Sequence, residues 1–569
     1  MAVPRDSLRA HHGAGLIFRL RQWLLGLRLA LARTRLGRMR YHASRFRFVP
    51  PHLHLADPSV AGDFLSGQIA LAGRSLLAGG RDVLDLAPPS IDFSVALHGF
   101  DWLRHFDASG DPFLRAGARR ILAQWLDRRE AGTLPEANLP GGIPRRVIAW
   151  VTHSGLIAEK ADLTTYRRLL AHLARDASML QILAQRRDIG ILGLECAIAL
   201  LVHALSLDLP LGAIRRAETI LLTALAEGIE TDGGPKNRDA GSAVVLAADL
   251  IPLLALYRAR QLPAPEAISS TLLGMIGFIR MMQHPDGGLA QFSGAGLVTR
   301  DLVAQVTRFG AGRVARLDSA PETGFERLED DNGIIIADTG HIPPPAFGNQ
   351  AGASALAFEF STKFDRIIVN CGMPPSADAE TARSFRTGPA HSTVLIDDHA
   401  LASIEPVETI LGSLEYHVTS EDAGTYPDRR QINGQDYLTI GHAGLRRATG
   451  YVVERRLSLL PGGNGLVGVD RMIDIDQRSE NRRITLAFHL HPRALAVPLS
   501  RQDAVVLRLP HQSPGRDMWI FEAPGIGLHL EESRCFEQSI SLPKTEAIVL
   551  DVAISGTTEI SWRLIPYRG

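Results

Sequence analysis

The stretch ITLAFHLH, residues 484–491, alternates large apolar side chains with smaller or more polar ones. A period of two places the apolar residues on one side of an extended chain, as in a strand with one buried face. Residues 356–361 alternate in the same way, and β-rich runs separated by turn signals continue after about residue 315. This half of the sequence predicts an antiparallel β-sandwich.

Residues 60–310 have the longer period of a helix. Apolar residues recur at three- and four-residue steps between 114 and 126, with similar patterns over about 165–185, 240–260 and 267–283. Gly- and Pro-rich breaks separate these patterns, and no strand pattern intervenes, so an all-α domain is predicted. We therefore expect three parts, a multidomain α+β chain: an arm over 1–59, a helical domain over 60–315 and a β-sandwich over 316–569.

The charge distribution is uneven, although the 569-residue chain carries 61 basic and 61 acidic residues and has zero net charge. Zero net charge argues against a nucleic-acid partner. Residues 1–50 hold eleven arginines and one acid, Asp6, and leucines at helical spacing over 16–36 predict a basic amphipathic helix. The arm could contact anionic lipid, RNA or a partner, or remain a solvated tail. Because Pro50 and Pro51 follow it, we expect residues 1–50 to be dispensable for folding.

Cysteine spacing and hydropathy indicate the cellular compartment in which the chain is expected. Cys196, Cys371 and Cys535 lack the spacing of a zinc or redox motif, and Cys196 is expected in the core. The apolar piece at 22–27 is shorter than the roughly 7–15 residues of a signal core. Charged residues interrupt the apolar run at 189–211, which predicts a buried helix and not a membrane span. We expect a cytoplasmic or peripherally membrane-associated chain, with the periplasm as the alternative.

Several segments together resemble bacterial heparinase II/III-like proteins, in the same order along the chain. In the sandwich half these are IIVNCGMP (367–374), GPAHSTVLIDD (388–398), YVVERRLSL (451–459) and LAFHLHP (486–492). In the helical half they are LHGFDWLRHF (97–106), TDGGPKNRD (231–239) and HPDGGLAQFSGAG (284–296). The resemblance implies an incomplete α/α toroid followed by an antiparallel β-sandwich, which agrees with the periodicities above.

The resemblance also implies polysaccharide lyase chemistry on a glycan that contains uronic acid. The C5 proton must be removed by a base while the adjacent carboxylate is neutralised, and an acid must protonate the departing O4 oxygen. The expected partner is therefore an anionic polysaccharide. The alternative is a non-catalytic glycan-binding or envelope-polysaccharide assembly protein that keeps the lyase fold. A hydrolase that uses a carboxylate pair in the toroid is supported by fold analogy alone.

Candidate catalytic residues in the sandwich half are two histidines. His391 aligns with the histidine of the family's AH(N/S)T segment, and His442, in TIGHAG, resembles a second family histidine that supports catalysis or helps to bind a structural metal. No cofactor is required, but a structural divalent metal in the sandwich would need an acidic ligand, and the sequence does not choose among four. These are Asp397, Asp398, Glu405 and Glu408.

The helical half departs from the family pattern in the segment TDGGPKNRD. The family places a tyrosine near the position of Ser242, and its Asn-His segment is absent where this chain reads RRDIGILG (186–193). Asn237 or Arg238 could neutralise a carboxylate, with substrate contacts from Lys236, Arg383 and Arg386; a purely structured loop is the alternative. If the chain is a lyase, His391 should face Asn237 and Arg238 across one sugar ring.

Three further features have simpler interpretations. His489 and His491 share one strand face, where they could bind a ligand or simply form a polar outer face, which we favour. Trp102, Trp125 and Trp150 could stack on sugars, but core packing is expected. The sequence contains neither a phosphate-binding GxxxxGK[ST] loop nor a GxSxG nucleophile motif.

Overall fold

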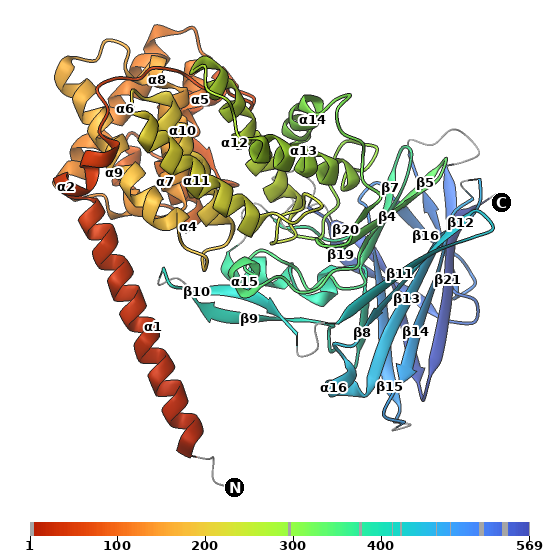
Figure 1. Ribbon diagram of the computed structural model, residues 1–569. Helices are drawn as coiled ribbons and strands as arrows, with labels where there is room; N and C mark the ends of the chain where they lie inside the picture. The colour runs from red at the N-terminus through yellow and green to blue at the C-terminus, as the bar shows by residue number, and fades with distance from the viewer. Residues whose placement is uncertain are drawn as a thin grey trace. The chain divides into compact units, whose positions relative to one another are not determined.

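The computed structural model describes residues 5–293, 298–374, 378–411, 414–420, 424–462, 464–477, 480–510, 517–536 and 544–567 (Figure 1). Helices dominate the chain up to Phe309, and two short helices occur later in the chain. They are α1 (Arg5–Ala32), α2 (Arg35–Arg38), α3 (Pro58–Ser66), α4 (Ile91–Gly99), α5 (Leu103–Asp107), α6 (Pro112–Ala131), α7 (Gly142–Thr152), α8 (Ser154–Ile157), α9 (Leu163–Ala184), α10 (Ile191–Ser206), α11 (Leu211–Gly228), α12 (Ala240–Ala259), α13 (Glu266–Met281), α14 (Arg300–Phe309), and the short α15 (Ala379–Ser384) and α16 (Arg446–Thr449).

Two compact units make up the chain. One comprises Met1–Gly228, Ala248–Ser270 and Val407–Glu415, and the other comprises Ile229–Ala247, Thr271–Pro406 and Tyr416–Gly569. The second unit therefore holds the strands after residue 315 together with the loop 229–239, most of α13 and all of α14. A loop of the helical half thus folds with the sandwich.

The first unit is helical with one exception. Residues 68–77, where the sequence shows no strand pattern, form a small antiparallel hairpin of β1 (Gln68–Leu71) and β2 (Arg74–Leu77). Gly73 has a positive φ of 72°, which suits the tight turn that this hairpin needs. The three tryptophans, as expected, lie in the core, where Trp125 and Trp150 pack edge to face with ring centroids 5.4 Å apart.

The arm over 1–59 is not a detached tail. Phe46 forms a β-bridge with Leu207, the backbone N–H groups of Arg47 and Phe48 both donate to the Ser206 carbonyl, and Tyr41 is buried. These contacts argue against the expectation that residues 1–50 are dispensable for folding, because residues 46–48 complete backbone pairing at the end of α10. Composition alone does not reveal this pairing, since it uses main-chain groups.

Helix α1 is apolar on two opposite faces. Leu25 and Ala32 are buried, while a second row remains largely exposed: Leu20, Trp23, Leu24, Leu27 and Leu31. Arg19, Arg21 and Arg28 are exposed between the two rows. The helix is thus not amphipathic in the one-faced sense that the sequence predicts, because a leucine run with arginines at these steps places apolar groups on both sides.

The second unit contains two large antiparallel sheets, as predicted. One has the strand order β11–β12–β13–β14–β21–β18–β17–β16, and the other has the order β19–β20–β15–β7–β6–β5–β4–β3, with β8 paired to β15; β9 and β10 form a separate pair. The bounds are β3 (Ser319–Ala320), β4 (Phe325–Glu329), β5 (Gly333–Asp338), β6 (Phe358–Thr362), β7 (Arg366–Val369), β8 (Val394–Ile396), β9 (Ser403–Glu408), β10 (Leu414–Thr419), β11 (Thr425–Ile432), β12 (Gln435–His442), β13 (Tyr451–Leu459), β14 (Leu466–Asp474), β15 (Arg482–Leu490), β16 (Leu495–Pro498), β17 (Ala504–Arg508), β18 (Met518–Glu522), β19 (Leu528–Arg534), β20 (Lys544–Ile554) and β21 (Thr558–Pro566).

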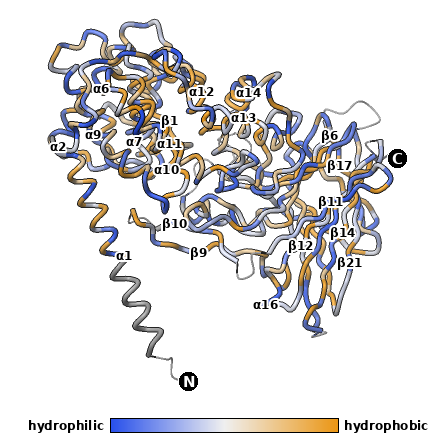
Figure 2. The backbone as a smooth tube through the Cα atoms, in the orientation of Figure 1, coloured by the Kyte–Doolittle hydropathy of each residue, from blue (hydrophilic) through white to orange (hydrophobic). Residues whose placement is uncertain are grey.

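One hydrophobic core lies between the two sheets. Ile484, Leu486 and Phe488 of β15 share it with Phe521 and Trp562 of the facing sheet. Along β21, Ile560, Trp562 and Leu564 are buried and alternate with exposed residues. Figure 2 shows both hydrophobic and hydrophilic stretches along the strands of this unit. The prediction of a β-sandwich from period-two patterning is confirmed.

The outer face of the sheet that contains β6 is also buried. The sequence predicts Glu359 and Ser361 on an outward face, but both are inaccessible because the loop 284–291 covers them. Both ring nitrogens of His284 are hydrogen-bonded: Nδ1 lies 2.9 Å from Ser361 Oγ, and Nε2 lies 2.9 Å from Glu359 Oε2. His489 and His491, expected on a polar outer face, are buried as well. Chain segments covering a sheet leave no periodic signal in the strand itself.

Helix α12 is long and apolar enough to cross a membrane, yet 78% of its apolar window is buried inside the protein. Asp249 and an internal Pro252 interrupt it. Burial by neighbouring helices is the ordinary reason for such a composition in a core helix.

A buried ion pair within one sheet positions an arginine that links it to the other sheet. Arg455 on β13 places Nε 2.6 Å from Asp470 Oδ1 on β14, and both side chains are completely buried. Arg455 Nη1 also donates to the carbonyls of Leu356 and Ser392, at 3.0 and 2.8 Å, in segments that lead into β6 and β8 of the other sheet. Trp562 Nε1 donates to Asp470 Oδ2 at 2.8 Å.

Replacing Arg455 should destabilise the protein strongly. Arg455→Met would leave Asp470 buried without its cation, so we expect a loss of about 3–5 kcal/mol in the free energy of unfolding, measured by denaturant titration. The exposed neighbour provides a control: Arg456→Met should change the value by no more than about 0.5 kcal/mol. Equal effects of the two substitutions would contradict a bridging role for Arg455.

Candidate functional site

The segment DGGP (232–235) forms a tight, self-bonded loop. Asp232 accepts hydrogen bonds from the N–H groups of Gly234, at 3.1 Å, and Thr323, at 2.8 Å. Gly233 has a φ of +88°, and a methyl group added there would lie 2.2 Å from the Gly274 carbonyl carbon. Only glycine fits such a close approach of two backbones. These contacts explain the segment as a structural element that fixes the residues after it.

Arg238 is held by this loop in a structural role. Its φ is +60°, its Nε donates to the Thr323 carbonyl at 2.8 Å, and its Nη2 donates to the Gly324 carbonyl at 3.0 Å. Nη2 also forms an ion pair with the buried carboxylate of Asp338. Because the guanidinium is buried and already paired, the expected role of Arg238 as a carboxylate neutraliser is not supported.

Asn237 lies at the bottom of a small polar cluster. It is 1% exposed, and its Nδ2 donates to Ser242 Oγ and to Gln350 Oε1, both at 2.9 Å. Gln350 is exposed and Ser242 is half-buried, so the cluster reaches the surface. Both amide hydrogens of Asn237 are used within the protein. A substrate carboxylate would have to displace Gln350 or Ser242 to reach them.

His391 is enclosed in the second unit. It is 2% exposed, and neither ring nitrogen has a hydrogen-bond partner of normal geometry. A methyl group added at Gly352 would lie 2.7 Å from His391 Nε2, so the ring packs directly on that backbone. Burial, followed by the nearby His489, lowers the pKa of His391 to about 3, although the Arg386 backbone carbonyl opposes the shift. The ring is therefore neutral at ordinary pH.

The segment 350–352 connects the two predicted site residues. Gln350 accepts a hydrogen bond from Asn237. Gly352, two residues after Gln350, lies against the ring of His391. The structure thus brings His391 and Asn237 to opposite sides of one short segment. It does not give His391 the open, substrate-facing position that we expected, because Gly352 and the surrounding backbone cover the ring.

The other predicted residues have separate roles. His442 is 2% exposed, and its Nδ1 accepts from the Gly444 N–H at 2.9 Å in a local turn. Arg386 is buried and donates to the carbonyls of Ala351, Gly348 and Tyr416, so it ties the segment 348–351 to β10 and does not reach solvent.

Two of the expected substrate contacts remain accessible. Arg383 is exposed, with its guanidinium carbon 5.6 Å from the Tyr416 ring centroid. Lys236 is half-buried beside Asn237. Of the predicted cations, these two could still contact an anionic ligand in the conformation described.

The proposed acidic metal ligands do not converge. Asp397 is engaged by Arg482 Nη1 at 2.8 Å and by the Arg483 N–H at 2.8 Å. Within the residues that the structure describes, no group of three His, Cys, Asp or Glu side chains is placed to hold a metal ion.

Sequence reasoning missed the buried carboxylate of Glu359. Its Oε1 accepts from the N–H of Gln291 at 2.7 Å and from the N–H and Nδ2 of Asn370, both at 3.1 Å. Asn370 Oδ1 in turn accepts from the Ser392 N–H at 2.9 Å. Three segments that carry the family resemblance, around 284–291, 367–374 and 388–398, are therefore joined through Glu359. The sequence signal that could have indicated this carboxylate is an acidic residue between two phenylalanines in a predicted strand.

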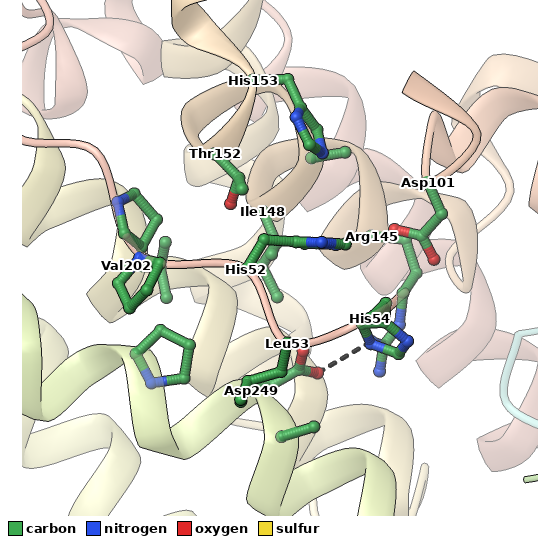
Figure 3. Close-up of a pocket in the computed structure, with 15 residues that line it drawn as sticks. His52, Leu53, His54, Asp101, Arg145, Ile148, Thr152, His153, Val202 and Asp249 are labelled. Carbon is green, nitrogen blue, oxygen red and sulfur yellow. Dashed lines mark hydrogen bonds and ion pairs between the residues drawn. The ribbon is translucent and has the colours of Figure 1, made fainter. Parts of the chain in front are cut away.

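A second polar pocket lies within the first unit (Figure 3). His52, His54 and His153 line it with Arg145 and Asp249, and Arg145 donates to Asp249 Oδ2 at 2.8 Å. Burial lowers the pKa of His52 to about 3 and raises the pKa of Asp249 to about 6. The free volume of about 30 Å³ suits one or two water molecules and is too small for a sugar ring.

Buried histidines should make the protein sensitive to acid. The pKa values of His391 and His489 fall from 6.5 to about 3 and about 4 because burial disfavours the charged ring. The unfolded chain binds these protons below pH 6.5 and the folded chain does not, so stability is retained above pH 6.5 and lost as pH falls below it. His391→Gln should reduce the loss between pH 7 and pH 5 by up to about 2 kcal/mol, measured by urea titration at both pH values.

The exposed His529 serves as the control for this experiment, since His529→Gln should leave the pH dependence unchanged. An unaltered pH dependence in the His391 variant would show that the imidazole is protonated as readily in the folded chain as in the unfolded one.

Comparison with known proteins agrees with this architecture. Residues 312–563 match the family described as Heparinase II/III-like, C-terminal. FtsZ-localized protein C of Caulobacter vibrioides (strain NA1000 / CB15N) is 28% identical over 526 residues, which cover 90% of this chain and 89% of that protein.

Two solved structures share the fold at low sequence identity. A crystal structure of heparinase III covers 99% of this chain and 92% of its own, with a TM-score of 0.71 and 13% identity. The heparan sulfate lyase HepC from Pedobacter heparinus gives a TM-score of 0.58 at 14% identity, over 99% of this chain and 91% of its own. At such identities the likeness establishes the fold, a helical toroid followed by a β-sandwich. Residues 312–563 thus match the Heparinase II/III-like, C-terminal family by sequence, and the whole chain shares the fold of the heparinase III structures.

Proposed function

We propose that this chain is a non-catalytic member of the heparinase II/III-like group, a glycan-binding or assembly protein that keeps the lyase fold. The observation that carries the proposal is the state of His391, an enclosed and neutral ring with a pKa of about 3. A general base works best when its pKa lies near the operating pH and when it reaches the substrate proton directly. His391 meets neither condition.

The remaining catalytic requirements support the same proposal. The guanidinium of Arg238 is paired with Asp338, and both amide hydrogens of Asn237 are used by Ser242 and Gln350. At the position where the family pattern has a tyrosine, the serine hydroxyl of Ser242 donates to Asp239 Oδ2 at 2.8 Å. A serine hydroxyl is a far weaker acid than a phenol, and this one is already bonded.

The relative from Caulobacter vibrioides adds independent support. Its name states localisation with FtsZ and describes no catalytic activity, and the match extends over 90% of this chain. We carry this over as a proposal: the chain acts beside FtsZ as a protein of an assembly, and its lyase-like surface serves for binding.

A retained lyase activity is the second candidate. The polar cluster around Asn237 opens to the surface at Gln350, and Lys236 and Arg383 can still contact an anionic sugar. Rearrangement of the segment 350–352 would be needed to expose His391, because Gly352 lies against its ring.

Turnover assays distinguish these candidates. The purified chain, incubated with a panel of uronate polymers, should bind at least one of them and yield neither the ultraviolet absorbance of unsaturated uronate nor new reducing ends. Active heparinase III is the positive control. An absorbance gain that is abolished by Asn237→Ala would overturn the non-catalytic proposal in favour of the lyase. Reducing ends without absorbance would indicate a hydrolase.

We also propose that the chain attaches peripherally to a membrane through α1. The exposed row has exposed fractions of 44–62%: Leu20, Trp23, Leu24, Leu27 and Leu31. Arginines flank this row, and no acidic residue occurs between positions 7 and 56. An exposed apolar helix face bordered by arginine is typical of a helix that lies in the interface of an anionic bilayer. The opposite face, with Leu25 and Ala32, remains packed on the protein.

A charge in the exposed row should release the protein from membranes. Leu27→Glu should weaken co-sedimentation with vesicles that contain anionic phosphatidylglycerol by at least about tenfold. The substitution removes a leucine that is buried in lipid when the helix is bound, and it adds a charge that the lipid headgroups repel. Gly26→Glu adds the same charge at an exposed position outside the row, with open space around it, and should have a much smaller effect. Equal losses, or binding that does not require anionic lipid, would contradict the proposal.

A further inference from the structure

The second unit has a groove lined mainly by cations. It has a volume of about 680 Å³, within the range of ordinary ligand sites. A single carboxylate, that of Glu329, lies among its lining residues. The cations come from α13, α14, the segment after α14, β4 and the turn between β6 and β7, and they are Arg280, Arg308, Arg316, Arg327 and Lys363.

Three of these cations are positioned by the protein and keep their charge. Arg327 places Nη2 2.6 Å from Glu329 and donates through Nη1 to the carbonyls of Met281 and Gln283. Arg316 shares the same carboxylate, with Nη1 2.6 Å from Glu329 Oε2, and its Nη2 pairs with Asp318 Oδ1 at 3.1 Å, so two carboxylates face the five cations. Arg280 donates only to backbone carbonyls, those of Val314 and Thr307. Carbonyl partners fix a guanidinium without neutralising it, so a net positive charge remains along the groove.

The other two cations are free to meet a ligand. Arg308 and Lys363 are exposed, and neither forms an ion pair within the described part of the chain. Lys363 is followed by Phe364, whose side chain is 57% exposed at the same turn. The groove is thus lined by two exposed cations together with three that the protein holds in place, and an exposed aromatic ring follows Lys363 in the chain.

From this arrangement we infer that the groove is a binding site for an anionic oligosaccharide, one that carries carboxylate or sulfate groups. Guanidinium groups bind planar or tetrahedral oxyanions through paired hydrogen bonds, and an exposed aromatic ring offers a surface for a sugar face. The zero net charge of the chain, with acidic residues elsewhere on its surface, argues against a general polyanion surface.

The groove is distinct from the site considered above. Neither His391 nor Asn237 lines it, and its walls come from α14 and from β4. The inference rests on the proposed glycan-binding function for the class of ligand, and it assigns the residues that would perform the binding.

Charge reversal at the two free cations tests the inference. With the full-length chain and a heparin tetrasaccharide as probe, the double variant Arg308→Glu/Lys363→Glu should bind at least tenfold more weakly by calorimetry, and its affinity should depend less on salt. Both residues are exposed, so the fold should tolerate the change, which a thermal melt verifies. Arg456→Glu reverses an exposed arginine on β13, outside the groove, and is the matched control.

The outcomes separate the inference from the function on which it rests. Tetrasaccharide binding that survives the double variant but is lost in Asn237→Ala would overturn the groove and keep the glycan-binding function. A wild-type chain that binds no anionic oligosaccharide would overturn both. Equal weakening by Arg456→Glu would show that diffuse surface charge, and not the groove, accounts for binding. Poly-glutamate that competes as well as the tetrasaccharide would overturn the ligand class.

Discussion

The ion pair between Arg455 and Asp470 is the interaction on which the rest of the second unit depends. A charged pair in the middle of a sandwich is tolerated only where every donor and acceptor is satisfied. Arg455 meets this demand by donating to the carbonyls of Leu356 and Ser392, which lead into strands of the opposite sheet, while Trp562 supplies a further donor to Asp470. The backbone of Ser392, and with it the adjacent His391, is therefore positioned from inside the core.

A second buried carboxylate extends this framework outward. Glu359 gathers the backbone of Gln291 and the amide of Asn370, and Asn370 accepts from Ser392. His391 thus lies between two rigid networks, with Gly352 against its ring. Its missing hydrogen bonds do not arise from mobility of its surroundings. The segments on either side are held by other partners, and burial of the imidazole makes its protonation unfavourable.

Period and spacing in the sequence were sufficient for the fold class. Strand β15 and the helices α6 and α9 bury the faces that their patterns predict, because burial of one face is what such periods record. The same reasoning could not predict that Glu359 and His489 are buried, since covering segments distant in sequence decide the outer face of a sheet. It also could not predict the two-sided character of α1 or the role of Arg238, whose partner Asp338 is a hundred residues away. The candidate site was located by resemblance, but the accessibility of each residue depends on tertiary contacts.

The framework and the site place different demands on the fold, and this difference bears on the proposed non-catalytic function. The catalytic groups of such a site need open access and tunable pKa values, whereas the framework of Arg455, Glu359 and the DGGP loop needs only complete hydrogen bonding. In this chain the framework is intact, and the groups at the site have been drawn into it: Arg238 onto Asp338, Asn237 onto Gln350, Arg386 onto three carbonyls. Each of these contacts stabilises the folded chain and removes a donor from the ligand. Under the proposed function, a protein selected for binding or assembly would gain from that exchange, because a stable scaffold preserves a binding surface without requiring turnover.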